Sequence, residues 1–417
     1  MIDTSHTPPP HTRPVTAVGE LTVSGPEFNA LATLTDHPGT LAALRRARLS
    51  RNLAFLAAVL RGGTEGLPPQ ARAGFELLVQ VQRRAPEAAR EILQHPRFGA
   101  WAAVCAVENA GVGTEAPLSH LASFAAAAAI RARIDFDLDL PRVGDAVVVP
   151  GLGCWTGPAD TDPRIRYRGT ETAHLDRWHW TPLRTLSAQL PAGRIDVEFD
   201  DLPATPSAWP DLPPPGRDTR WTPWSDTEYC SWRQLFDAAM RLLCQIVPEL
   251  ATPLAHGLRA VLPRDRELSS FRTSTLVDSF GATAMVLPAD PMAAATGLLH
   301  EFQHSKLAVL MEMRPLIRTD GPADLPSPWR TEPRPPSALL HGVYAHLAVA
   351  RFWHRAAQHP TATPVPAADP VRQQTLTACD TLLDTDRLTP AGRQFVTLMR
   401  HTAVTDSDGH PAAATLR

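Results

Sequence analysis

The positions of proline and glycine constrain the fold of this chain most strongly, because proline disrupts the interior of a helix and glycine weakens it. From about residue 30 to residue 133, apolar residues recur at steps of three to five, as in amphipathic helices. This pattern is interrupted at Gly62-Gly63, Pro68-Pro69, Pro86 and Pro96. The sequence therefore predicts a helical N-terminal region built from several helices of ordinary length.

The pattern changes near Ile134, where apolar and polar residues begin to alternate. Segments 134–140 and 195–199 have this two-residue period, which indicates half-buried strands. Seven prolines then fall within residues 203–224 and predict a linker. We therefore expect a β-rich middle that ends at this linker.

Beyond the linker, the pattern predicts a helix over 226–247 and a strand-like stretch over 274–287. The next helix has well-defined ends, since Asp290 is a suitable N-cap and Pro315 a terminator. Further helices are expected from about 337 to 355 and from Thr389-Pro390 onward.

Composition and charge limit the classes of partner. The 417-residue chain is 44% apolar with a formal charge of −3, so its charge gives no reason to expect nucleic acid or an anionic membrane as a partner. It has neither a signal-peptide pattern nor an apolar run long enough to span a bilayer. Its five cysteines are scattered and form no CxxC pair, as is typical of a reducing cytosol. We therefore expect a cytoplasmic protein.

A candidate metal site lies at residues 300–304, whose sequence HEFQH is an HExxH motif. Residues four apart share a helix face, so His300 and His304 are expected to bind one ion, iron or zinc. Glu301 lies about 100° around the helix, where it could hold or deprotonate a bound water. The motif therefore supplies two metal ligands and a candidate catalytic carboxylate.

A third ligand must come from another element. The metzincin extension is excluded, because Leu307 and Leu310 stand where it requires glycine and histidine. Glu312 lies about 12 Å along the same helix from His304 and cannot bend back.

The helix expected after residue 337 offers His341 and His346, and the loop before it offers Glu332. Five positions separate the two histidines, about 140° around a helix, so both cannot face one ion. His346 is favoured because Gly342, one turn earlier, leaves room for an imidazole and a metal. His341 suits a core position better, and Glu332 stays as an alternative ligand.

Three basic residues lie near this site in sequence. Arg330 and Arg334 precede the second helix, where guanidinium groups suit bidentate binding of a carboxylate, although they could equally be solvated surface residues. Lys306 is the only lysine in the chain. It is either a chance survivor on a helix surface or a positive charge held near a carboxylate or an anionic ligand.

The segment 300–307, the loop 329–335 and the segment 342–348 resemble the actinobacterial HExxH-motif peptide-modification family, and segments 94–101 and 125–133 are also similar to it. Members of that family accompany ribosomally made peptides and are described as iron(II), 2-oxoglutarate-dependent peptide β-hydroxylases. The resemblance implies a precursor peptide as substrate.

The resemblance also implies roles for individual residues. His300, His304 and His346 would hold the iron, and Arg334, with Arg330 second, would bind a carboxylate of 2-oxoglutarate. Glu301 would then be a hydrogen-bonding partner beside the site rather than a base.

Two other functions stay open. The bare motif favours a zinc metallopeptidase in which Glu301 activates water, although no standard third-ligand pattern accompanies it. The third hypothesis is a peptide-binding module with a structural metal; a carboxylate-binding arginine argues mildly against it, because a closed site needs no co-substrate.

The expected fold class is α+β, with a helical N-terminal region, a β-rich middle and a zincin-like metal-binding catalytic domain. We expect a flexible leader over 1–25, an N-terminal domain over 26–202, the proline-rich linker over 203–224, a catalytic domain over 225–405 and a flexible tail over 406–417.

Overall fold

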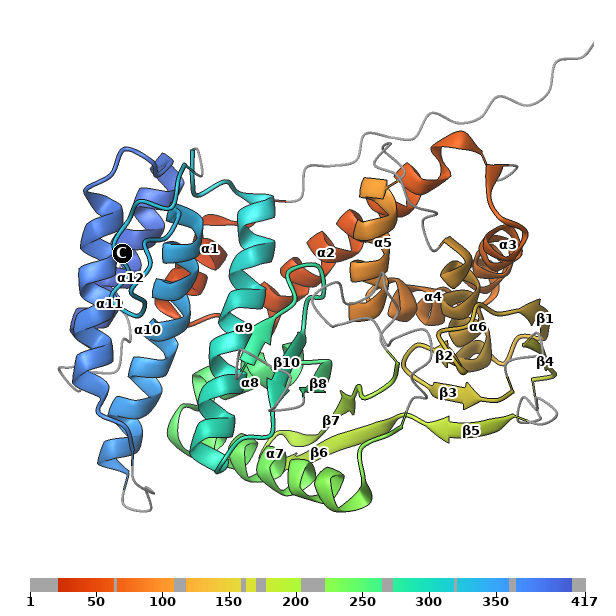
Figure 1. Ribbon diagram of the computed structural model, residues 1–417. Coiled ribbons are helices and arrows are strands. Elements are labelled where there is room, and N and C mark those ends of the chain that lie inside the picture. Colours follow the sequence, from red (N-terminus) through yellow and green to blue (C-terminus); the bar gives the residue numbers. More distant parts are fainter. Residues whose placement is uncertain are drawn as a thin grey trace, which may run out of the picture.

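The structure is a computed structural model of the chain (Figure 1). It describes residues 22–63, 66–108, 118–158, 163–169, 178–203, 222–264, 273–318, 321–359 and 365–406. The predicted leader up to residue 21, most of the predicted linker and the predicted tail after residue 406 lie outside the described residues.

The N-terminal region is helical, as the spacing of apolar residues predicts. Its helices are α1 (Gly25–Thr33), α2 (Pro38–Val59), α3 (Pro69–Arg84), α4 (Pro86–Leu93), α5 (Pro96–Glu108) and α6 (Leu121–Ala132), with short 3₁₀ turns η1 (Leu60–Gly62) and η3 (Leu118–His120). Four of them start at a proline, whose fixed φ and missing N–H suit the first helical position. The alanine run 125–129 in α6 has no exposed surface.

The β-rich middle begins with two small antiparallel sheets. Strand β1 (Phe136–Asp139) pairs with β4 (Arg164–Tyr167), and β3 (Gly153–Thr156) lies between β2 (Ala146–Val149) and β5 (His179–Pro182). Strand β1 falls within the predicted strand 134–140.

A five-stranded sheet lies beside helix α9 (Figure 1). Its order is β6 (Arg184–Leu190), β7 (Gly193–Phe199), β8 (Ala260–Arg264), β10 (Ala282–Val286) and β9 (Thr273–Thr275). The three inner strands are parallel to one another and both edge strands are antiparallel. The sheet therefore joins strands that come before and after the predicted proline-rich linker.

The C-terminal region is mainly helical. Its helices are α7 (Asp226–Ile246), α8 (Pro248–Gly257), α9 (Pro291–Met313), α10 (Pro336–Gln358), α11 (Ala368–Leu383) and α12 (Pro390–Thr405). As predicted, Asp290 caps α9 by accepting a hydrogen bond from the Ala293 N–H at 2.8 Å, and α9 ends before Pro315. The architecture is thus mixed α+β: a helical N-terminal region, a β-rich middle and a helical C-terminal region.

One predicted strand had the wrong extent, and two helices were not predicted. The stretch 274–287 is not one strand, because residues 276–281 turn and return the chain from β9 to β10. Helices α8 and α11 were not predicted: α8 is short and contains Pro253, and the buried residues of α11 include the polar Thr375 and the small Ala378. No helix in the described part of the chain is long and apolar enough to cross a membrane.

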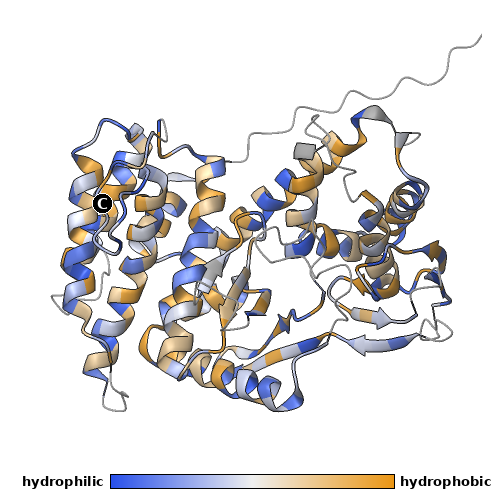
Figure 2. Ribbon diagram, viewed as in Figure 1, coloured by the Kyte–Doolittle hydropathy of each residue, from blue (hydrophilic) through white to orange (hydrophobic). Residues whose placement is uncertain are grey.

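The first two helices pack against the C-terminal region. Helix α1 contacts α12, and α2 contacts α8 and α9 as well as α5 (Figure 1). Phe28, Leu31 and Leu44 consequently belong to the same buried core as the C-terminal helices. Figure 2 shows hydrophilic and hydrophobic residues alternating on surface helices such as α7 and α11, as one-sided packing requires. The predicted division into two domains stays a prediction.

The only lysine of the chain lies inside this core. Lys306 Nζ is 2.7 Å from Asp36 Oδ1, and the side chains are 1% and 0% exposed. The ammonium is also 5.7 Å from the ring centre of Phe302 and 5.6 Å from that of Tyr344. Of the two interpretations of Lys306, the structure supports a charge held near a carboxylate, and the pair joins the α1–α2 connection to α9.

Removing either charge of this pair is expected to destabilise the protein. Lys306→Met or Asp36→Asn should lower the free energy of unfolding by about 3–5 kcal/mol, because the remaining polar or charged group stays buried without its partner. Urea unfolding followed by circular dichroism measures this change.

The control for this prediction is Glu87→Gln, which breaks the exposed Glu87–Arg90 pair and should change the stability by no more than about 0.5 kcal/mol. The double variant Asp36→Leu with Lys306→Met should recover part of the loss, because no charge is then buried. Equally small losses at the two pairs would contradict a structural role for Lys306.

Candidate metal site

The HExxH segment brings two imidazoles together on helix α9. The Nε2 atoms of His300 and His304 lie 3.0 Å apart, and the two rings are nearly perpendicular, with centroids 4.6 Å apart. Both side chains are half-buried. This is the shared face that their four-residue spacing predicts.

Burial keeps these two histidines neutral near pH 7. Burial lowers the pKa of His300 to about 4, and burial together with the neighbouring histidines holds the pKa of His304 well below its usual value. A neutral imidazole has one N–H and one lone pair. At 3.0 Å, either one ring donates to the other or both lone pairs point at a shared cation.

The separation suits a shared ion. Imidazole nitrogens that bind one ion at about 2.1 Å lie roughly 3.0 to 3.4 Å apart, depending on the coordination geometry. The Nε2 atoms of His300 and His304 fall at the short end of this range.

Helix α10 places His346 against the same pair. Its Nδ1 is 2.8 Å from the Gly342 carbonyl oxygen. Because a carbonyl only accepts, Nδ1 carries the proton and the lone pair is on Nε2. The His346 ring stacks on Trp329, with centroids 4.2 Å apart and planes at 8°, and it meets His300 edge-on at 5.0 Å.

His341 approaches a different side of the pair. Its Nδ1 is 3.3 Å from Nδ1 of His304, the nitrogen on the other side of that ring from Nε2. Burial lowers the pKa of His341 to about 4 and that of His346 to about 3, so both are neutral near pH 7. The two α10 histidines therefore contact different rings of α9, as their five-residue separation requires.

The expectation that Gly342 leaves open space beside His346 was wrong. A Cβ on Gly342 would lie 2.9 Å from Cζ3 of Trp329, so the space is filled by the indole and not left for a ligand. Gly342 thus allows Trp329 to lie against α10, where it supports the His346 ring.

The Glu301 side chain contacts strand β9. It is 4% exposed and accepts a hydrogen bond from Thr275 Oγ1 of edge strand β9 at 2.5 Å. Burial raises its pKa, although hydrogen bonds from Thr273 and Thr275 oppose this. No sequence signal linked Thr275 to Glu301, because the contact joins a strand and a helix.

The other acidic candidates lie elsewhere. Glu332 is exposed in the loop before α10. Glu312 forms ion pairs with Arg48 at 3.4 Å and with Arg51 at 3.2 Å. These two arginines balance the charge of the Glu312 carboxylate, so it needs no metal as a partner.

The two predicted arginines differ in exposure. Arg330 is exposed, whereas Arg334 is half-buried. The backbone of Arg334 pairs with that of Leu325 through hydrogen bonds of 2.8 and 3.1 Å. Within the described residues, no hydrogen bond or ion pair involves the Arg334 guanidinium.

A complete metal-binding group is not formed by the described residues. Across these ranges, no three histidine, cysteine, aspartate or glutamate side chains gather closely enough to hold an ion. The histidine pair of α9 is in place, and a third donor would have to move toward it.

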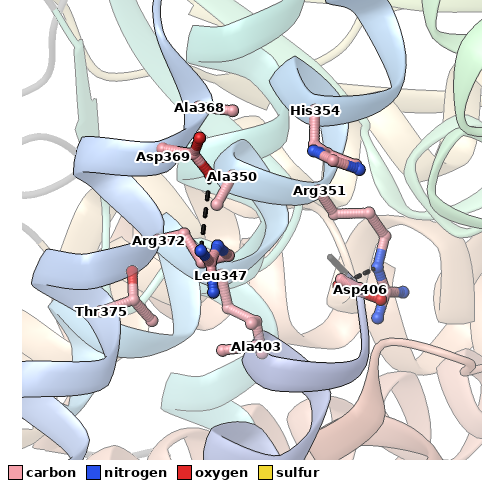
Figure 3. Close-up of a pocket in the computed structure, with 10 residues that line it drawn as sticks. All are labelled: Leu347, Ala350, Arg351, His354, Ala368, Asp369, Arg372, Thr375, Ala403 and Asp406. Carbon is pink, nitrogen blue, oxygen red and sulfur yellow. Dashed lines mark hydrogen bonds and ion pairs between the residues drawn. The ribbon is translucent and has the colours of Figure 1, made fainter. Parts of the chain in front are cut away.

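A cavity between α10, α11 and α12 does not belong to this site (Figure 3). Its two arginines are engaged within the protein, Arg351 with Asp406 at 2.8 Å and Arg372 with Asp369 at 3.5 Å. The cavity volume of about 10 Å³ holds roughly one water, so it has no room for a dicarboxylate.

Comparison with known proteins assigns no family. No protein-family model matches this chain, and no curated protein matches it with significant similarity.

Substitution of Gly342 tests the packing of Trp329. Inside a helix, alanine is more favourable than glycine by up to about 1 kcal/mol. Gly342→Ala would therefore stabilise the protein if the space beside Gly342 were empty. We expect a loss of about 1–3 kcal/mol instead, because the new methyl meets the indole. Urea unfolding and tryptophan fluorescence measure the two effects.

Gly25→Ala is the matched control, since nothing lies within 4 Å of a Cβ there. An increase in stability for Gly342→Ala, with unchanged fluorescence, would show that Trp329 does not rest on Gly342.

Proposed function

We propose that this protein is an iron(II), 2-oxoglutarate-dependent peptide β-hydroxylase. The observation that carries the proposal is the 3.0 Å approach of two neutral, half-buried imidazole nitrogens on α9. His300 and His304 would hold the metal. The motif resemblance supplies the choice of iron, 2-oxoglutarate and a precursor peptide.

His346 is the third ligand in this proposal. The hydrogen bond of its Nδ1 to Gly342 leaves Nε2 with a lone pair, and its ring adjoins His300. His341 is less suitable, because it contacts His304 at Nδ1 instead of on the Nε2 side. The description of this region as zincin-like, with β9, α9 and α10 around a metal, belongs to the same proposal.

The donor set is unusual for an iron oxygenase. Such enzymes commonly use two histidines and one carboxylate. Three neutral imidazoles leave the full charge of the ion uncompensated, which favours an anionic co-substrate. When bound, iron(II) would supply the chemistry by which dioxygen acts as the oxidant: one oxygen atom would enter a peptide Cβ–H bond, and the other would oxidise 2-oxoglutarate to succinate and carbon dioxide.

The contact of Glu301 weakens the alternative of a zinc metallopeptidase. A base that activates water must reach that water. Glu301 instead accepts a hydrogen bond from Thr275, and burial raises its pKa. We therefore assign Glu301 to holding β9 beside α9.

The class of reaction is tested with anaerobically purified protein. We expect bound iron, release of succinate that requires both 2-oxoglutarate and oxygen, and a co-expressed precursor peptide heavier by one oxygen atom. His300→Ala and His304→Ala should abolish metal binding, because two donors rarely hold an ion that three donors hold. Metal analysis, succinate assay and mass spectrometry give the three readouts.

His401→Ala, at an exposed position on α12, is the matched control and should keep full metal content. Bound zinc with peptide cleavage that is lost in Glu301→Gln would instead establish the metallopeptidase. Equal metal content in wild type, His300→Ala and His401→Ala would remove the basis for either enzyme.

Arg334 is proposed to bind a carboxylate of 2-oxoglutarate, because its half-buried guanidinium has no partner among the described residues. Arg334→Ala should weaken 2-oxoglutarate binding by roughly 10- to 100-fold, the value of a charged hydrogen bond, and leave metal content unchanged. Calorimetry on the metal-loaded protein measures both. Arg166→Ala, at an exposed position on β4, is the control, and unchanged affinity in Arg334→Ala would refute the assignment.

A further inference from the structure

His341 has no role in the proposed ligand set, although it is half-buried and contacts His304. The contact joins the two Nδ1 atoms at 3.3 Å, somewhat longer than a usual hydrogen bond. The other nitrogen of His304, Nε2, lies 3.0 Å from His300. The His304 ring therefore has a neighbouring imidazole at each nitrogen.

Only one arrangement of protons on His304 is compatible with a cation at the His300 side. A neutral imidazole has a single N–H, so a lone pair on Nε2 places the proton on Nδ1. That proton points at His341 Nδ1, which must then accept it with a lone pair. His341 in turn carries its own proton on Nε2.

We infer that His341 is a positioning residue for metal binding: it accepts the His304 Nδ1–H and so directs the His304 Nε2 lone pair toward the ion. This inference rests on the proposed metal site. A ligating histidine commonly donates its second N–H to a carboxylate, a carbonyl or water, which fixes both tautomer and ring orientation. Here the acceptor of the second N–H is the neutral imidazole of His341.

The tautomer of His346 is fixed by a comparable hydrogen bond. Its Nδ1 donates to the Gly342 carbonyl, which leaves the lone pair on Nε2. For His304, the hydrogen-bond partner of Nδ1 among the described residues is His341 on α10. The contact between α9 and α10 thus sets the tautomer of His304, and packing of the two helices becomes coupled to metal affinity.

Substituting His341 by asparagine or by leucine distinguishes a positioning role from a packing role. An asparagine in place of His341 would put its amide oxygen near the position of the imidazole Nδ1, whereas leucine fills similar space without an acceptor. His341→Leu should weaken cobalt(II) or zinc(II) binding by roughly 10- to 100-fold, and His341→Asn should stay within about threefold of wild type. Calorimetry gives affinities, and the visible spectrum of the cobalt(II) protein reports ligand geometry. His401→Leu is the control.

Nitrogen NMR on histidine-labelled, zinc-loaded wild type provides a test without any substitution. We expect the proton of His304 on Nδ1 and that of His341 on Nε2. A proton on His341 Nδ1 would overturn the inference, whether or not the leucine variant folds.

The outcomes separate this inference from the proposed function. If wild type binds none of these metals, the proposed function fails and the inference fails with it. If wild type binds and His341→Leu binds equally well, only the positioning role fails. Complete loss of metal in both His341→Asn and His341→Leu, equal to the loss in His304→Ala, would make His341 a ligand and also overturn the inference.

Discussion

Burial of helix α9 on nearly all sides is the constraint on which the candidate site depends. Because successive residues of a helix point about 100° apart, the HExxH segment meets a different neighbour at each position. His300 and His304 face α10, Glu301 faces β9, and Phe302 lies where any side chain on Gly257 of α8 would overlap its ring. Any shift of α9 would alter all these contacts together, which holds the two imidazoles in place.

The interior around α9 contains more charge than a purely apolar core. Lys306 is buried with Asp36, and Arg351 donates to the carbonyls of Thr33 and Leu34 as well as to Asp406. Such pairs contribute little net stability, but losing one partner is costly. They connect the N-terminal helices to the helices that carry the histidines, so the site depends on segments far away in sequence.

Much of the helical architecture was predictable because its signals are local. Proline at the first position, an acidic or hydroxyl cap before it and a regular apolar stripe act over one or two turns. Thr389 caps α12 through the Gly392 N–H at 3.0 Å, as the sequence suggests. The buried residues of helix α11 have helical spacing, but they include the polar Thr375 and the small Ala378, so the apolar signal of this helix is weak in the sequence.

The sequence by itself determined that His300 and His304 share a helix face, because 3.6 residues per turn leave no other arrangement. It also determined where α9 begins and ends. Only the tertiary structure decided what surrounds that face: Trp329 in the space beside Gly342, Thr275 as the partner of Glu301, and His341 at Nδ1 of His304. These contacts join elements tens of residues apart, and no local spacing encodes the packing that brings such elements together.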